Sequence, residues 1–277
     1  MKILDIYKDS LSYPNKDIDK LLTLGVLFFL DGIISLLPSV TIALNQNLAS
    51  QILYFISNIF GIIVFFIVIG YGVSIIKNTI TDSNMPSIKI IKNFINGIKI
   101  FIISIIYYIL PSAITLILAY FSGVLNGAIQ VALIYLNYGP EVISHISHLT
   151  SLDFNMDIAI IIAIIGFILF VLTTLFLFIA IARFAYTNKI KSSFYFKEII
   201  NDINNITWKK YLISDILFLI ILIVLMIIAT ISIVIPFIGF IIFFLAILPF
   251  VTIFSGRTFG LIYKEGKELD KLNNTIK

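Results

Sequence analysis

Residues 70–111 read GYGVSIIKNTITDSNMPSIKIIKNFINGIKIFIISIIYYILP. An uncharged apolar run ends here in a Gly-Tyr-Gly motif at 70–72 and then Lys77. A turn around Pro86 follows, then a basic amphipathic segment, and then a second apolar run that contains Pro111. This order is typical of two membrane-spanning helices that are joined on the side of the membrane where the basic residues lie.

The composition of the whole chain agrees with this interpretation. Of its 277 residues, 60% are hydrophobic and only 12% are charged, and the mean hydropathy is +1.10. Such values lie outside the range of soluble domains. The apolar runs are continuous and do not alternate with polar residues, which excludes an outer-membrane β-barrel. We therefore predict an all-α fold, a polytopic transmembrane helical bundle in which residues 1–277 form a single membrane domain.

The apolar runs predict about six spanning helices, with amphipathic interfacial elbow helices between them. The segment 123–138 is apolar but shorter than a span, so we expect a re-entrant or interfacial helix there. It lies in an ambiguous segment, 122–157, which we place on the outer side. The spans are expected at residues 21–44, 52–76, 100–121, 158–182, 211–235 and 237–263.

Three segments have the pattern of interfacial elbows: residues 3–13, 86–99 and 194–208. In the second, isoleucines recur three or four residues apart while lysines and asparagines lie elsewhere around the helix. Each elbow precedes two spans, so the chain reads as a threefold repeat. Two glycine pairs are expected to allow close helix packing: Gly25 with Gly32, and Gly123 with Gly127.

The lysines and arginines predict the topology. All 19 lie in residues 1–20, 77–99, 183–210 and 257–277. Six crossings place these four segments on one side, and the positive-inside rule makes that side cytoplasmic, with both termini. We expect a multi-pass protein of the cytoplasmic membrane whose partners are anionic lipid headgroups at the inner face, with protein partners or a homo-oligomer in addition and no nucleic acid.

Ionisable residues inside the spans are candidate functional residues, because a charge at the bilayer centre is costly. Asp31 lies deepest, roughly 16 Å beyond the preceding lysine at about 1.5 Å per residue. We expect Asp215 to pair with Arg183 or Arg257 and to lock the helices together. For Asp31 two interpretations stay open: a hydrogen bond to a neighbouring helix, or coupling to the movement of a proton or an ion.

No signature of enzymatic chemistry is present in the sequence. It contains no P-loop, no G-x-S-x-G, no H-E-x-x-H and no cysteine. We therefore expect no enzymatic activity, no catalytic residue and no cofactor. Glu141, His145 and His148 follow an i, i+4, i+7 spacing that could bring them to one helical face, which makes them a weak external metal candidate or simply loop residues.

Five short segments and one proline carry a resemblance to a known family. They are IYKDSLSYP at 6–14, KLLTLG at 20–25, GYGVSIIKNTI at 70–80, NGIKIFIISIIYYILP at 96–111 and GRTFGLIYKEG at 256–266, together with Pro86. With these segments the chain resembles a family of prokaryotic, mainly archaeal, integral membrane proteins known as domain of unknown function 4013. The resemblance implies an archaeal cytoplasmic membrane protein and carries no set of catalytic residues.

Three hypotheses for the function follow. The leading one is a non-enzymatic, membrane-organising or partner-binding helical bundle that acts through its basic inner face. The second is a small transporter or permease with a coupling acid at Asp31, and the third is an intramembrane enzyme with dispersed residues. An aqueous cavity that reaches Asp31 would favour transport, whereas a solid core around Asp31 would favour the bundle.

Overall fold

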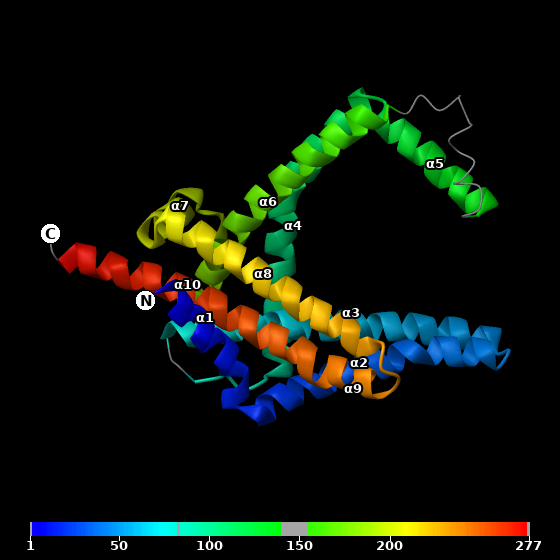
Figure 1. The fold of residues 1–277 in the computed structure, drawn as a ribbon, viewed down its shortest axis with the longest axis horizontal. Coiled ribbons are helices and arrows are strands. Elements are labelled where there is room, and N and C mark those ends of the chain that lie inside the picture. The colour runs from blue at the N-terminus through cyan, green and yellow to red at the C-terminus, as the bar shows by residue number, and fades with distance from the viewer. Residues whose placement is uncertain (1, 82–83, 140–154, 276–277) are drawn as a thin grey trace. The chain divides into compact units, whose positions relative to one another are not determined.

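All secondary-structure elements in the part that the structure describes are helices (Figure 1). The structure is a computed structural model and describes residues 2–81, 84–139 and 155–275. The elements in chain order are α1 (Ile3–Ser12), η1 (Tyr13–Lys16), α2 (Ile18–Ala43), α3 (Asn47–Thr81), α4 (Ile90–Phe121), α5 (Val124–Tyr138), α6 (Met156–Thr187), η3 (Ile190–Phe194), α7 (Phe196–Ile206), α8 (Trp208–Ile233), α9 (Ile238–Ile242), η4 (Phe243–Ile247) and α10 (Leu248–Thr275).

Six helices in the described ranges are long and apolar enough to cross a membrane. They are α2, α3, α4, α6, α8 and the run Ile238–Leu269, which joins α9, η4 and the first part of α10. The predicted all-α fold with six spans is therefore confirmed. Most observed helices extend several residues beyond the predicted spans, because polar residues at their ends continue the helical hydrogen bonding.

The helices form two compact units, Met1–Ile103 with Phe178–Lys277 and, separately, Ser104–Leu177. In the first unit, α10 contacts α1, α2, α3, α7 and α8. Two glycines let α10 approach α3 closely. A Cβ atom on Gly256 would lie 3.0 Å from the Ile75 side chain, and one on Gly260 would lie 2.5 Å from that of Thr79. Small residues four apart are a common means of close packing between membrane helices.

The stretch 70–111 contains a crossing of α3 and α4 in which the two backbones touch. A Cβ atom on Gly70 would lie 1.7 Å from the carbonyl oxygen of Asn93, and one on Gly97 would lie 1.9 Å from that of Phe66. Each glycine therefore accommodates the other helix. Next to the crossing, the buried Tyr71 donates a hydrogen bond to the Pro86 carbonyl oxygen at 3.0 Å, which fixes the turn between the helices.

The expectation of a separate elbow helix over 86–99 is wrong. Residues 86–89 have no regular secondary structure, and α4 begins at Ile90 and continues into the span without a break. Ile91 is 77% exposed whereas Asn93 is only 1% exposed, so the isoleucines face outward and the asparagines face the protein. Since lipid is as apolar as isoleucine, an isoleucine that faces outward loses little in a membrane.

The other two elbows do form separate short helices. Helix α1 ends before Pro14, as predicted, and η1 follows it. Helix α7 contacts α10 and buries Ile199, Ile203 and Ile206. These three isoleucines are thus covered by protein, whereas Phe196 and Ile200 of the same helix stay exposed.

The glycine pairs have different outcomes. Gly25 and Gly32 pack against η4, a π-helical segment: Cβ atoms on them would lie 2.4 Å from the Leu245 carbonyl oxygen and 2.8 Å from the Phe244 ring. Their packing role is confirmed. The packing role of Gly123 is wrong. It lies before α5 with a φ of 77°, and the structure has no described atom within 4 Å of the position of a Cβ atom on Gly123.

In the second unit, α4 and α6 pack through a few polar and aromatic contacts. The Tyr108 ring stacks on Phe170 with 5.4 Å between the ring centroids, and its hydroxyl shares a 2.8 Å hydrogen bond with that of Thr174. Gly166 lies against Thr115. Helix α5 has 15 residues and is shorter than the six long helices, in agreement with the prediction.

Candidate functional site

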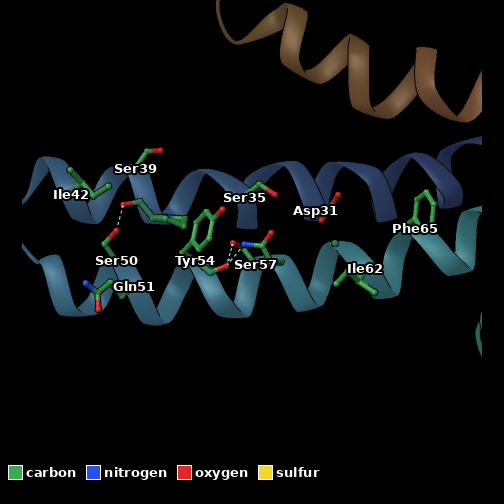
Figure 2. Close-up of a pocket in the computed structure, with 13 residues that line it drawn as sticks. Asp31, Ser35, Ser39, Ile42, Ser50, Gln51, Tyr54, Ser57, Ile62 and Phe65 are labelled. Carbon is green, nitrogen blue, oxygen red and sulfur yellow. Dashed lines mark hydrogen bonds between the residues drawn. The ribbon is translucent and has the colours of Figure 1, made fainter. Parts of the chain in front are cut away.

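A groove of about 800 Å³ runs along α2 and α3 within the first unit. It reaches from the hairpin end of these helices, at Ile42 and Ser50, to Asp31 and Phe65 (Figure 2). We call it the polar groove, because hydroxyl, amide and carboxyl groups line much of it. Besides Asp31, its polar side chains are Ser35, Ser39, Ser50, Gln51, Tyr54, Ser57 and Asn58.

Asp31 lies at the inner end of the polar groove. A Cβ atom on Gly61 of α3 would lie 3.2 Å from its Oδ1 atom, so the glycine leaves room for the carboxyl group between the helices. Oδ1 is buried and has no hydrogen-bond partner among the described residues. An unpaired carboxyl group in apolar surroundings is costly, and it gains free energy by binding a proton or a cation. The hydrogen bond to a neighbouring helix that one interpretation offered is not present in the described structure.

Other polar groups of the groove are held by backbone carbonyls. Pro38 interrupts the hydrogen bonding of α2, and its own carbonyl oxygen accepts from Ser50 at 3.2 Å. On α3, the Tyr54 carbonyl accepts from Ser57 at 3.0 Å and from Asn58 at 2.6 Å. A hydroxyl that donates to a backbone carbonyl keeps its oxygen lone pairs as acceptors. The groove therefore presents mostly oxygen atoms, which suit a cation or a protonated solute.

Apolar packing closes the groove beyond Asp31. Leu24 and Tyr71 are fully buried in a cluster with Tyr13, and Leu27 and Phe28 pack against this cluster. These residues lie between Asp31 and the lysine-bearing ends of the helices. Buried apolar residues thus lie beyond Asp31, whereas most residues of the polar groove itself are exposed along α2 and α3.

The sequence had identified Asp31 but not the rest of the groove. The signal was present: Ser50, Tyr54 and Ser57 are spaced four and three residues apart, and so are Asp31, Ser35 and Pro38. This spacing places each set on one helical face. Serine is common in membrane helices, so a single serine in an apolar run does not indicate a site.

The expected pairing of Asp215 with Arg183 or Arg257 is wrong. Arg183 binds Asp202 at 2.7 Å and Glu198 at 2.9 Å, and Arg257 binds Asp9 at 2.8 Å. Both arginines reach carboxylates on the short helices α7 and α1. The Oδ1 atom of Asp215 is buried, with no hydrogen-bond partner in the described ranges.

Tyr7 of α1 connects the N-terminus to the start of α8 near Asp215. Its hydroxyl donates a hydrogen bond to the backbone carbonyl oxygen of Ser214. Burial, together with the neighbouring Asp215 carboxyl group, raises the pKa of the Tyr7 hydroxyl well above its usual value. The hydroxyl therefore stays protonated and remains a donor at any physiological pH.

Two networks of ion pairs hold the lysine-bearing end of the first unit. In one, the buried Asp202 accepts from Arg183, from Lys267 at 2.7 Å and from the Tyr263 hydroxyl at 3.2 Å. In the other, Arg257 joins Asp9 and lies over the Tyr13 ring, 4.3 Å from its centroid. Both networks join one of the short helices to a long helix, which marks them as architecture.

We expect the contribution of Asp9 to stability to disappear in acid. Burial acts to raise the pKa of Asp9, but hydrogen bonds and charge attraction from Arg257 and Lys16 outweigh it and hold the pKa below its usual value. A lowered pKa means that the stabilisation is present above the ordinary aspartate value of about 3.9 and is lost as the pH falls further. At neutral pH, Asp9→Asn should therefore lower the free energy of unfolding by about 1 kcal/mol, since the carboxylate is partly exposed.

Unfolding curves of the two proteins in detergent, recorded across the acidic range, measure this difference. It should shrink towards zero below about pH 4. A difference that stays constant down to the lowest pH would show that the charge of Asp9 is not the cause.

The metal candidate Glu141, His145 and His148 lies outside the described residues. Among the residues that the structure does describe, no group of three or more histidine, aspartate or glutamate side chains could hold a metal ion. The metal site therefore stays a prediction from the sequence.

Comparison with known proteins identifies the family. Residues 52–248 match the family model described as "Protein of unknown function (DUF4013)". Neither the curated proteins nor the solved structures contain a match. The match includes the segments at 70–80 and 96–111 that carried the resemblance in the sequence, and it covers well over half of the chain. The chain therefore belongs to the DUF4013 family.

Proposed function

We propose that this protein is a small membrane permease that takes a proton, a small cation or a protonated solute through the polar groove to Asp31. The observation that supports the proposal is the groove itself, which has a volume of about 800 Å³ and ends at an unpaired carboxyl group inside a span. A bundle that only organises the membrane has no need of such a groove. The sequence had offered transport as its second hypothesis, with a cavity at Asp31 as the criterion in its favour.

The distribution of charge gives the proposed orientation. The hairpin end of the groove, at residues 45–51, contains no lysine or arginine, so the positive-inside rule assigns it to the outer side. Both termini are then cytoplasmic. Solute would enter from outside, exchange water for the hydroxyl and amide oxygens of the groove, and meet Asp31 near the middle of the membrane.

Passage to the inner side requires the packing beyond Asp31 to open. Leu24 and Tyr71 fill that path in the present conformation. Two features are suited to movement: the π-helical segment η4, which packs on Gly25 and Gly32 beside this path, and Pro38 inside α2 on the hairpin side of Asp31. π-Helical turns and prolines are common where membrane helices bend. Neutralisation of Asp31 by the bound ion removes the cost of an unpaired charge and would favour such a rearrangement.

The test is ion flux into liposomes that contain the purified protein. Fluorescent dyes for protons, sodium and potassium report uptake by wild-type protein and by Asp31→Asn, which keeps the shape of the side chain but not its charge. Since a hydrogen bond to a charged group contributes about 1.5–3 kcal/mol, Asp31→Asn should reduce the flux by about tenfold or more. The matched control is Asp215→Asn, another acid within a span but outside the groove, which should leave the flux unchanged.

Two outcomes would contradict the permease proposal. In one, wild-type liposomes take up none of the three ions faster than empty liposomes do. In the other, Asp31→Asn transports as well as the wild type while both proteins elute as the same monodisperse species. Either result returns the membrane-organising bundle to first place.

A membrane-organising bundle is the second candidate, and one observation favours it. The lysine-bearing end of the first unit presents exposed isoleucines beside exposed lysines, as at Ile91 and Lys92. Such a surface suits the boundary between acyl chains and anionic headgroups. The two functions do not exclude each other.

A further inference from the structure

A second, smaller pocket of about 210 Å³ lies at the lysine-bearing end of the first unit, between the end of α3, the start of α4 and the end of α6. We call it the lysine pocket. This volume equals that of about seven molecules of liquid water. Its lining residues are Val73, Ser74, Lys77, Asn78, Pro86, Ser87, Lys89, Lys92, Asn93, Asn96, Ala185 and Asn188.

Three lysines line this pocket, and no carboxylate is among the lining residues. Two shallower hollows adjoin it through Asn188 and add Lys99, Lys189 and Lys191, again without a carboxylate. In the described structure none of these lysines makes an ion pair. Elsewhere at this end of the unit, charges are matched, as Arg183 with Asp202 or Lys210 with Glu265. The positive charge of the lysine pocket therefore lacks a counter-charge from the described protein.

Asn93 provides an independent sign of a missing ligand. Its side chain is 1% exposed and lines the pocket, and its Oδ1 atom accepts a hydrogen bond from Ser74 at 2.9 Å. Its Nδ2 donor is buried and has no hydrogen-bond partner among the described residues. Since a buried donor without a partner costs about 1–3 kcal/mol, the site gains if an oxygen acceptor enters.

The backbone adds to the same preference. The lysine pocket adjoins the first turn of α4, where the leading N–H groups have no intrahelical acceptor and the helix dipole is positive. Asn188 takes a φ of 57° directly after α6, a conformation that asparagine tolerates, and so comes to line the pocket. Ammonium groups, amide donors and a helix N-terminus together are the features of a phosphate site.

We propose that the lysine pocket binds a phosphate group, held by Lys77, Lys89 and Lys92 and by the Nδ2 atom of Asn93. The phosphate belongs to an anionic lipid headgroup or to a soluble phosphate compound. Exposed Ile91 and Ile95 line the adjoining hollow, where the acyl chains of a lipid would lie. The site is separate from the polar groove and does not depend on the permease proposal.

The experiment measures phosphate binding by full-length protein in lipid nanodiscs. In one arm, the discs contain equal amounts of phosphatidylglycerol and phosphatidylcholine. Native mass spectrometry then counts the phosphatidylglycerol molecules that stay bound to the protein after it is released from the disc. In the other arm, the discs contain phosphatidylcholine alone. Inorganic phosphate is added stepwise, and the midpoint temperature of unfolding of the protein is measured at each concentration. Lys77→Gln/Lys89→Gln/Lys92→Gln is compared in both arms with the wild type.

The matched control changes three exposed lysines outside the pocket, Lys8→Gln/Lys197→Gln/Lys209→Gln, so that the net charge falls equally. Because each lysine near the phosphate contributes to its attraction, the pocket variant should lose binding by about tenfold or more, and the control should lose little. Ser87→Asp, an exposed change in the same pocket, should act like the triple variant without altering the core. Lys→Arg at the three positions should restore binding.

The two arms separate the sources of the phosphate. Loss confined to the phosphatidylglycerol arm identifies a lipid headgroup, and loss confined to the titration identifies a soluble phosphate compound. Equal loss in the pocket variant and the control, or no specific binding by wild type in either arm, would overturn the proposal. Binding that is unchanged in Asp31→Asn would show that the two sites are independent.

Discussion

Gly97→Ala is expected to lower the free energy of unfolding by about 3 kcal/mol or more, because it forces α3 and α4 apart. The new Cβ atom would lie 1.9 Å from the carbonyl oxygen of Phe66 and 2.6 Å from the carbonyl carbon. Both are backbone atoms, so a change of rotamer cannot relieve the overlap. The helices would have to separate, and the reciprocal contact of Gly70 with Asn93 would be lost with them.

Gly72→Ala is the control for this substitution. Gly72 lies in α3 two residues from Gly70, and no described atom lies within 4 Å of the position of its Cβ atom. Since alanine is better than glycine inside a helix by up to about 1 kcal/mol, this variant should be as stable as the wild type or slightly more so. Unfolding by SDS in mixed micelles, followed by circular dichroism, measures both. Equal midpoints for Gly97→Ala and the wild type would show that the crossing is not needed for the fold.

The sequence was sufficient to predict the number and approximate limits of the spans. Length and hydropathy are local properties, and a span needs little else to be recognised. The run at 123–138 illustrates this, because its 16 residues were too few and α5 is indeed a short helix. The elbow at 86–99 and the role of Gly123 were predicted wrongly, because both depend on which neighbour a segment meets.

Which face of a helix turns inward is harder to predict in a membrane. The usual amphipathic pattern places isoleucine inside, but α4 turns Ile91 outward and Asn93 inward, because lipid is as apolar as isoleucine and offers no gain for burial. The close contact of Gly70 with α4 likewise could not be seen from the Gly-Tyr-Gly motif alone. It needs the register of two helices, which no local pattern contains.

Of the residues of the candidate site, the sequence predicted only Asp31, the one whose position inside a span is most costly in free energy. Asp31 stands out since a carboxyl group in a span always requires an explanation. The arginines stood out for the same reason, but their partners were predicted wrongly. Asp9 and Arg257 are 248 residues apart in sequence, and no local pattern links them.

Asp202→Asn is expected to lower the free energy of unfolding by about 3–5 kcal/mol, because it leaves two cations without their main counter-charge. The carboxylate is 4% exposed and accepts from Arg183 through one oxygen and from Lys267 through the other, both at 2.7 Å. The Tyr263 hydroxyl adds a third donor. An asparagine can accept through one oxygen only, and its NH₂ group would face one of the cations.

This network also fixes α7 between α6 and α10, so the damage should be local as well as global. In hydrogen exchange, the amides of α7 should lose protection in Asp202→Asn before those of α2 and α3 do, since α7 depends on the network and the hairpin does not.

Glu198→Gln is the matched control. Glu198 also binds Arg183, but its side chain is 54% exposed, so its loss should cost no more than about 1 kcal/mol. If the two variants unfold at the same midpoint, burial of the Asp202 carboxylate is not what makes the network important. If α7 keeps its protection in Asp202→Asn, the isoleucine face of α7 alone is sufficient to hold it against α10.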